Sequence, residues 1–119
     1  MTMPYQHGTL AAGGWQKFSL VEQLANIGSE VGRARRWRDE GGKRFDGAVR
    51  RALELFDLTI ADERWRGRLK EICRAREFFC DAVEGGKDWG MTLEWLDQYF
   101  LQFAVAARAD GAVNDITRT

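Results

Sequence analysis

The chain has 119 residues and equal numbers of basic and acidic side chains, 18 of each, so its formal net charge is zero. A zero net charge provides no overall electrostatic attraction to nucleic acid or to an anionic membrane. The length suffices for one hydrophobic core, and 45% hydrophobic and 30% charged residues with a single proline are typical of a folded, helix-rich domain. No apolar run approaches the roughly 20 residues that a membrane span needs, and the N-terminus lacks a signal pattern, so we expect a cytoplasmic protein with no membrane partner.

Charge is unevenly distributed along the chain. Residues 33–76 contain 14 basic and 8 acidic side chains, whereas residues 77–119 contain 3 basic and 8 acidic ones. We expect the two regions to form salt bridges within the fold or between subunits. Cys73 and Cys80 lie seven residues apart, about 10 Å along one helix, which is too far for a disulfide, and we interpret them as small buried side chains.

Residues 1–14 show no hydrophobic periodicity and end in two glycines, which predicts a flexible leader. The first helix follows Ser19, because Ser19 and Glu22 have the spacing of a capping box. Its apolar residues recur at steps of three and four: Leu20, Leu24, Ile27, Val31 and Ala34. Gly28 and Gly32 weaken this helix, although they would let another helix approach closely. The helix is expected to stop at the glycine pair, residues 41–42.

Three further helices are expected. The second covers residues 43–61, the third runs from a cap at Asp62 to the glycines at 85–86, and the fourth covers residues 93–109 with Thr92 as its cap. The core faces of the second and fourth helices are expected to comprise Phe45, Val49, Ala52, Leu53, Phe56 and Ile60, and Leu93, Leu96, Phe100, Phe103 and Ala107, respectively. Residues 110–119 are polar and are interpreted as a flexible tail.

Four amphipathic helices joined by short glycine-containing turns predict an all-α, up-and-down four-helix bundle that occupies residues 15–109. The last helix is apolar over a wide arc, which is typical of a helix with two packing partners. Leu58 and Phe78 are expected to point outward. We therefore predict a homo-oligomer whose interface includes Leu58, Phe78, Trp95 and Tyr99.

Arg76 projects from the middle of the apolar face of the third helix. A buried guanidinium requires carboxylate partners, because an unpaired interior charge is very costly. Glu30 and Asp57 lie at the margins of the core faces of the first two helices, and Asp81 and Glu77 are nearer in sequence. We predict a buried polar tie between Arg76, Glu30 and Asp57, and a ligand-binding Arg76 stays open as the alternative.

A second basic cluster lies around the end of the first helix. It comprises Arg33, Arg35, Arg36, Arg38, Lys43 and Arg44. Trp37 in its middle could stack on a base, so this cluster is the candidate nucleic-acid surface. Against this interpretation, acidic residues 39 and 40 follow at once, and the stems of Arg35 and Arg38 could instead pack over the edge of the core.

The sequence offers little support for catalysis. The only histidine, His7, has no chelating or catalytic companion, so we expect no catalytic residue, no metal site, no cofactor and no identified small-molecule substrate. One enzyme hypothesis remains: Glu54 with Asp57, and Glu94 with Asp97, have the one-turn spacing of carboxylates that hold Mg²⁺ in helical nucleotide hydrolases.

Four ordered segments carry a family resemblance: "WQKFSLVEQLANIGSEVGRARRW", "RALELFDLTIAD", "RWRGRLKEICRAREFFCD" and "YFLQFAVAAR". Together they resemble the bacterial four-helix-bundle proteins named for 23S rRNA intervening sequences, whose relatives include the accessory protein of diversity-generating retroelements. The resemblance spans roughly residues 15–108 and implies a left-handed up-and-down bundle, a ring of five copies and no enzyme activity. The retroelement proteins bind nucleic acid through a strongly basic surface, and the zero net charge of this chain departs from that pattern.

These observations favour a non-enzymatic, cytosolic scaffold or interaction module that assembles with itself into a pentamer. The alternative is an RNA- or DNA-binding accessory protein that uses the basic cluster, and the third hypothesis is the Mg²⁺-dependent hydrolase.

Overall fold

The structure, a computed structural model, describes residues 13–109, and within them it is all-helical without a strand. The four α-helices are α2 (Leu20–Trp37), α3 (Gly42–Ile60), α4 (Leu69–Val83) and α5 (Leu93–Ala109), and two short 3₁₀ helices, η1 (Gly14–Lys17) and η2 (Glu63–Arg68), precede α2 and α4. Among these described helices, none combines the length and the apolar character that crossing a bilayer requires. The predicted leader with His7 and the predicted tail lie outside the described residues, apart from positions 13 and 14.

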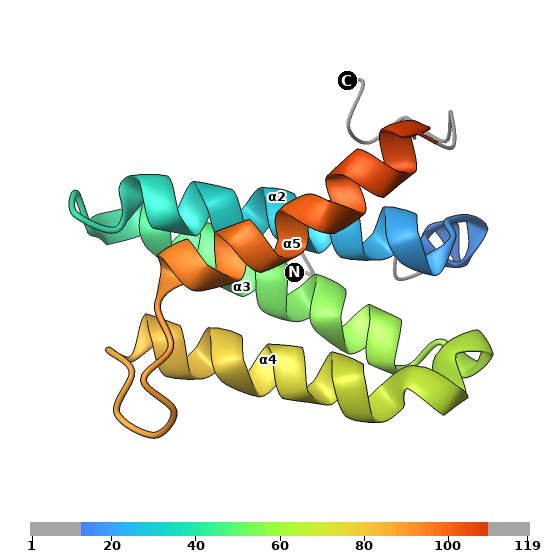
Figure 1. Ribbon diagram of the computed structural model, residues 1–119. Helices are drawn as coiled ribbons and strands as arrows, with labels where there is room; N and C mark the ends of the chain where they lie inside the picture. Colours follow the sequence, from blue (N-terminus) through green and yellow to red (C-terminus); the bar gives the residue numbers. More distant parts are fainter. Residues whose placement is uncertain (1–12, 110–119) are drawn as a thin grey trace, which may run out of the picture.

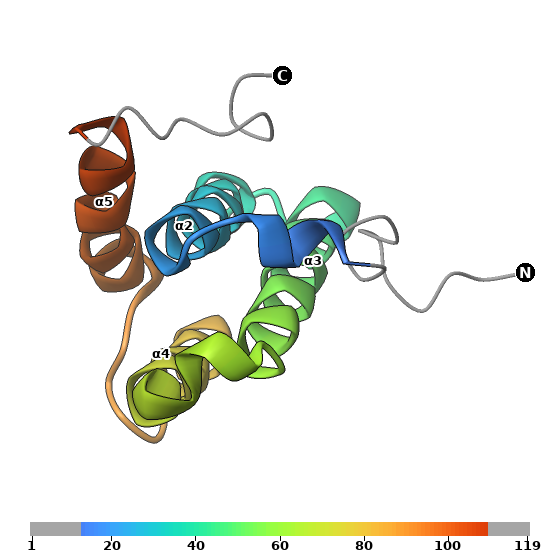
Figure 2. The same cartoon turned by 90° about the vertical axis from the view of Figure 1, so that its right-hand side faces the viewer.

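Consecutive α-helices run in opposite directions (Figure 1). Seen along the helices, α2 lies between α3 and α5, and α4 occupies the remaining side (Figure 2). The most extensive contacts are those of α2 with α5 and with α3, whereas α4 packs more sparsely on α3 and α5. This arrangement fits the predicted four-helix bundle.

The helix caps explain where α2 and α5 begin. The Ser19 hydroxyl accepts the backbone N–H of Glu22 at 3.2 Å, and the Glu22 carboxylate accepts the N–H of Ser19 at 2.8 Å, which confirms the predicted capping box. Thr92 likewise caps α5, since its hydroxyl accepts the N–H of Trp95 at 3.0 Å. Of the stripe predicted for α2, Leu24, Ile27, Val31 and Ala34 are buried.

Glycines let α2 and α5 approach closely. A Cβ atom on Gly28 would lie 2.7 Å from Cβ of Phe100, and one on Gly32 would lie 3.2 Å from a carboxylate oxygen of Asp97. No real Cβ atom occupies the first of these positions without a shift of its neighbours. The two glycines that weaken α2 as an isolated helix therefore position α5 against it.

The core joins all four helices, and Phe56 of α3 lies at its centre. Its ring contacts those of Phe79 from α4 and Phe100 from α5, each at 6.0 Å between centroids. Leu58 belongs to the same core and is only 9% exposed, so its predicted outward orientation is wrong. The reason is that α3 contacts α2, α4 and η2, which together cover a wider arc than one apolar stripe predicts.

The predicted third helix is interrupted. Asp62 acts as its predicted cap, accepting the N–H of Arg64 at 3.1 Å, but the residues that follow form η2, and α4 starts only at Leu69. Trp65 has non-helical dihedrals (φ −101°, ψ 19°). This conformation lets its indole N–H donate to the side chain of Gln23 at 3.0 Å, a tertiary contact that replaces helical continuity.

A buried polar network closes this end of the bundle. Trp15 of η1 is fully buried, and its indole N–H donates to the hydroxyl of Thr59 at 3.0 Å. The Gln23 amide, also fully buried, donates to the carbonyl of Trp15 at 2.9 Å and to the carboxylate of Asp62 at 3.2 Å. Sequence periodicity did not identify Trp15 as a core residue, because it precedes the first amphipathic helix.

Candidate functional site

Four aromatic side chains gather where α4, α5 and the loop between them meet. We call Phe78, Trp89, Trp95 and Tyr99 the aromatic cluster. Phe78 packs edge-on against Trp89 (5.7 Å between centroids) and against Trp95 (6.2 Å), and Trp95 stacks on Tyr99 (5.6 Å). Trp89 and Trp95 are 51% and 49% exposed, respectively, whereas Phe78 and Tyr99 pack partly against the core. Three residues of the predicted interface, Phe78, Trp95 and Tyr99, thus lie together with Trp89, whereas Leu58 is buried in the core, and an interface at these residues stays a prediction.

A small apolar groove lies between α4 and α5 beside the aromatic cluster. Its volume is about 120 Å³, and it is lined by Glu71, Arg74, Ala75, Phe78, Trp95, Leu96 and Tyr99. The guanidinium of Arg74 lies over the rings of Phe78 and Trp89, at 5.8 and 5.4 Å from their centroids. Burial raises the pKa of Tyr99, and the nearby carboxylate of Glu71 raises it further. Tyr99 is therefore a neutral hydrogen-bonding group at neutral pH.

Asp81 organises the loop that carries Trp89. Its buried carboxylate accepts three backbone N–H groups, from Asp88 at 2.8 Å, Trp89 at 3.1 Å and Met91 at 3.0 Å. Burial alone would raise the pKa of Asp81, but these three hydrogen bonds outweigh it and hold the pKa below its ordinary value. Asp81, which lies near Arg76 in the sequence, thus accepts hydrogen bonds from the backbone of the loop and not from Arg76.

The outward face of α5 carries two more exposed apolar residues. Leu101 is 49% exposed and Val105 is 54% exposed, and they lie one helical turn apart. Five exposed residues of α5 follow one another at alternating spacings of four and three residues, and we call them the outer stripe: Glu94, Gln98, Leu101, Val105 and Arg108. The C-terminal half of α5 diverges from α3 and α4 (Figure 1).

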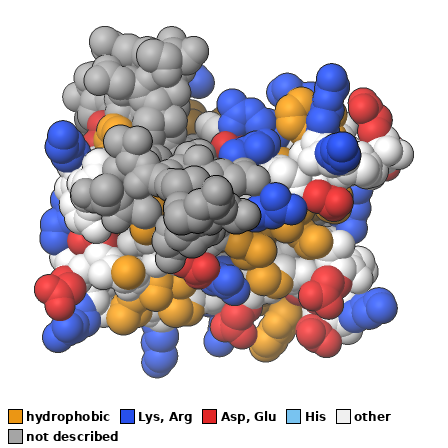
Figure 3. All heavy atoms as spheres, turned by 180° about the vertical axis from the view of Figure 1, so that it is seen from behind, with side chains coloured by type: hydrophobic (Ala, Val, Ile, Leu, Met, Phe, Trp, Pro, Cys, Tyr) orange, Lys and Arg blue, Asp and Glu red, His pale blue; other side chains and the backbone are white. Residues whose placement is uncertain are grey.

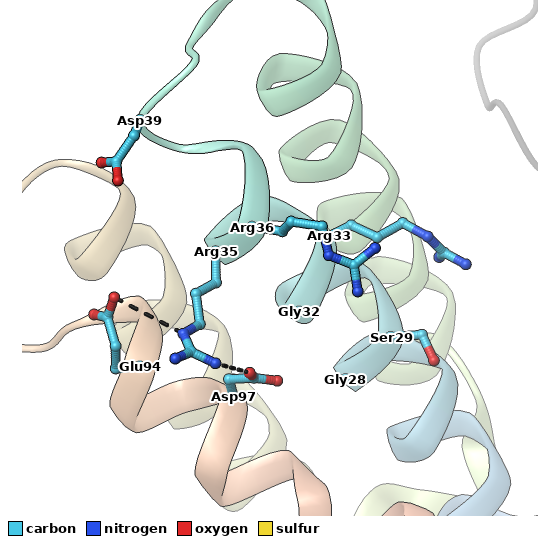
Figure 4. Close-up of a pocket in the computed structure, with 9 residues that line it drawn as sticks. All are labelled: Gly28, Ser29, Gly32, Arg33, Arg35, Arg36, Asp39, Glu94 and Asp97. Carbon is cyan, nitrogen blue, oxygen red and sulfur yellow. Dashed lines mark hydrogen bonds and ion pairs between the residues drawn. The ribbon is translucent and has the colours of Figure 1, made fainter.

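An open polar pocket lies between α2 and the first turns of α5 (Figure 4). Its volume is about 710 Å³, and it is lined by Gly28, Ser29, Gly32, Arg33, Arg35, Arg36, Asp39, Glu94 and Asp97. Arg35 reaches between Asp97, at 2.9 Å, and Glu94, at 3.9 Å, whereas Arg33 and Arg36 extend in another direction. The lining thus contains three arginines and three carboxylates and has no net formal charge, and Arg35 is the arginine that pairs with the carboxylates of Glu94 and Asp97.

The six cations of the predicted nucleic-acid surface do not form one patch. Arg33 pairs with Glu30 at 3.1 Å, and Arg38 donates to the carbonyls of Ala82 and Val83 at the end of α4. Arg44 lies over the ring of Trp37 at 5.6 Å and so covers the aromatic face proposed for stacking. Among the described residues, Arg36, Lys43 and Arg44 have no ion pair. Figure 3 shows cations and anions interspersed over the face seen from behind.

The predicted buried tie at Arg76 is corrected in two respects. Arg76 does pair with Asp57, at 2.9 Å, but their side chains are 34% and 50% exposed, so this ion pair lies near the surface. Glu30 is not part of it, because Arg51 and Arg33 take its carboxylate, each at 3.1 Å. The sparse packing of α4 keeps this side of its helix near water.

Glu94 and Asp97, one of the two carboxylate pairs considered for Mg²⁺, bind Arg35. Within residues 13–109, no three His, Cys, Asp or Glu side chains are grouped so as to hold a metal ion. Cys73 and Cys80 are free thiols and half-buried rather than fully buried. Burial raises the pKa of Cys80, so its sulfur stays a thiol at neutral pH.

Comparison with protein-family models, with curated proteins and with solved structures finds no match to this chain. The family resemblance of the four sequence segments therefore stays a prediction.

Proposed function

We propose that the protein is a non-enzymatic helical scaffold that assembles with copies of itself. The observation that carries this proposal is the exposure of Trp89, Trp95, Leu101 and Val105, each about half accessible, within a single stretch of 17 residues, 89–105. Exposed apolar surface marks interaction sites in soluble proteins where it gathers into a patch. Burying such side chains contributes roughly 25 cal/mol for each Å² of apolar area removed from water.

The organisation of this surface supports a built interface rather than incidental exposure. The carboxylate of Asp81 holds the loop of Trp89, and the ring of Tyr99 supports that of Trp95. The side chains are thus ordered before any partner arrives, which lowers the entropic cost of association. The sequence segments quoted above add support, because the family that they resemble forms rings of five copies.

Sedimentation velocity of the purified chain over a range of concentrations tests the proposal. We expect species heavier than the 13.6 kDa chain whose fraction rises with concentration, and the fitted mass gives the number of copies. Trp95→Lys should shift the distribution toward the monomer. The matched control is Gln16→Lys, which adds the same charge at an exposed position of η1. A wild-type chain that stays monomeric at every concentration contradicts the proposal.

Nucleic-acid binding is our second proposal, supported by three cations of the predicted patch, Arg36, Lys43 and Arg44, that form no ion pair with another described residue. It ranks below self-association because the other members of the predicted patch pair with carboxylates or backbone carbonyls. Its test is a titration of the binding affinity with salt.

A further inference from the structure

Two surface segments carry opposite charges that the fold does not pair with each other. Residues 36–44, which we call the basic turn, join α2 to α3 and contain four basic and two acidic side chains. Residues 84–95, which we call the acidic loop, lead from α4 into α5 and contain three acidic side chains and one basic side chain. In the described chain, no ion pair joins the basic turn to the acidic loop. Each segment thus keeps an excess charge that a partner can neutralise.

Aromatic rings are exposed within the acidic loop. Trp89 and Trp95 are each about half exposed, and three exposed carboxylates neighbour them in the sequence: Glu84, Asp88 and Glu94. The carboxylate of Glu94 has a long contact with Arg35, at 3.9 Å, and the other two have no ion pair in the described chain. An indole ring attracts a guanidinium or ammonium group to its face, and a nearby carboxylate attracts the same cation. The acidic loop therefore has the chemistry of a site for basic side chains.

One cation of the chain itself already lies over this surface. The guanidinium of Arg74 lies 5.4 Å from the centroid of the Trp89 ring, and its contact with the carboxylate of Glu77 is long, at 3.8 Å. Trp95 differs, because Tyr99 stacks on one face of its ring and no cation of the described chain lies over the other face. Trp95 is therefore the ring that can receive a cation from another molecule.

The basic turn has cations of the kind that the acidic loop can bind. Arg36 and Lys43 are exposed and form no ion pair with another described residue. Arg44 also lacks an ion pair, although its guanidinium lies over the ring of Trp37. The basic turn of one copy thus matches the acidic loop of another copy both in the sign of its charge and in the groups it presents.

The positions of the two segments favour a contact between copies that stand side by side. The turn between α2 and α3 and the loop between α4 and α5 both lie at the left end of the bundle in Figure 1. Seen along the helices, the loop lies on the side of α4 and α5, whereas the turn lies on the side of α2 and α3 (Figure 2). Each copy can therefore bind one neighbour through its basic turn and another through its acidic loop. A contact of this kind, between two different surfaces, closes into a ring when the rotation from copy to copy divides a full turn.

We infer that copies of this chain associate head to tail, with the basic turn of one copy on the acidic loop of the next and a cation of that turn over the ring of Trp95. This inference rests on the proposed self-association and names the two surfaces that meet. It assigns the free cations of the predicted nucleic-acid patch to a second copy of the chain.

Mixing two variants tests the head-to-tail contact. Arg36→Glu combined with Lys43→Glu reverses the charge of the basic turn and leaves the acidic loop intact, whereas Trp95→Lys does the opposite. Each variant alone should associate more weakly than wild type, with a dissociation constant raised about tenfold for each reversed charge and on the order of a hundredfold for Trp95→Lys. An equimolar mixture should form a dimer, and nothing larger, at concentrations at which neither variant associates alone. One intact basic turn then meets one intact acidic loop. Sedimentation velocity at low ionic strength measures all three samples.

Each variant has a matched control. Lys17→Glu combined with Lys70→Glu makes the same change in net charge at exposed positions of η1 and of the first turn of α4, at the other end of the bundle (Figure 1), and should leave association unchanged. Val105→Lys controls for Trp95→Lys, because Val105 of the outer stripe is similarly exposed but lies about 15 Å further along α5. It should weaken association far less than Trp95→Lys does.

The outcomes separate this inference from the proposed function. If the wild type assembles but the two variants do not associate when mixed, the inference is overturned and the proposed function stands. Assembly of the wild type that disappears after nuclease treatment means that nucleic acid bridges the copies, and it also overturns the inference. If the wild type is monomeric at every concentration, both proposals fail.

Discussion

Asp81 shapes the candidate surface without being part of it. Its carboxylate is buried near the end of α4 and accepts three N–H groups of the following loop, including that of Trp89. A protonated or amide side chain cannot accept all three bonds as well as a carboxylate does, because one of its two polar atoms becomes a donor. The position of Trp89 in the aromatic cluster thus depends on one ionised group.

Asp81→Asn should lower the thermal midpoint at neutral pH, and the difference from wild type should shrink in acid. The folded-state pKa of Asp81 lies below its ordinary value of 3.8, so the stabilising contribution of its carboxylate is fully present above that pH. It is lost as the pH falls through the folded-state pKa, where wild type also becomes protonated. Thermal unfolding of both proteins across an acid pH series measures this difference.

Glu84→Gln is the matched control for this experiment. Glu84 lies just beyond α4, is exposed, and makes no side-chain hydrogen bond among the described residues. Its replacement should leave the midpoint close to that of wild type at each pH. A constant difference between wild type and Asp81→Asn from neutral to strongly acid pH would contradict the role assigned to the Asp81 carboxylate.

At the scale of the elements, glycines set the distance between helices. Gly28 faces the Cβ atom of Phe100, which belongs to the buried face of α5 and has no room to move. Gly47 of α3 offers a contrast, because the nearest atoms to its added Cβ belong to the guanidinium of Arg51, the end of a flexible side chain. A side chain at Gly28 would therefore clash with the core, whereas one at Gly47 would displace only the end of a flexible side chain.

Gly28→Ala and Gly47→Ala should change stability in opposite directions. Alanine is favoured over glycine in a helix by about 1 kcal/mol, and this gain applies to both positions. At Gly28 the clash with Phe100 forces the helices apart, and overpacking of this kind costs about 1–3 kcal/mol, so we expect a net loss of up to about 2 kcal/mol. At Gly47 we expect a gain approaching 1 kcal/mol. Urea unfolding measures both, and a stabilised Gly28→Ala would refute the close packing.

Local signals predicted the elements where local interactions determine them. The caps at Ser19 and Thr92 and the apolar periodicity of α2 and α5 depend on residues within a few positions of one another, and the structure confirms them. The break before α4 has a non-local cause, the contact of Trp65 with Gln23, so helical periodicity missed it. The exposure of Trp89 depends on how the α4–α5 loop folds around Asp81, which residue patterns do not encode.

At the scale of the molecule, several arginines are neutralised close to where they occur in the sequence. Arg33, Arg66, Arg68 and Arg74 each pair with a carboxylate three residues away. Between the basic region 33–76 and the acidic region 77–119, the long-range ion pairs in the described chain are those of Arg35 with α5. The charge asymmetry was visible in the sequence, but the partner of each cation depends on which helix faces meet. A count of basic residues therefore overestimates the free positive surface.

This local neutralisation limits how steeply nucleic-acid binding can depend on salt. Each phosphate contact on duplex DNA contributes about −0.9 to the slope of log K against log salt concentration, so the three members of the predicted patch without an ion pair allow about −2.7, whereas the full six-residue patch requires about −5.4. We expect a slope no steeper than about −2.7 from fluorescence anisotropy with a mixed-sequence duplex, and its loss when Arg36, Lys43 and Arg44 are all replaced by glutamine. Lys70→Gln, at an exposed position of α4, should leave the slope unchanged.

A slope near −5 would mean that the arginines at 33, 35 and 38 exchange their protein partners for phosphates. It would place nucleic-acid binding ahead of self-association as the proposed function.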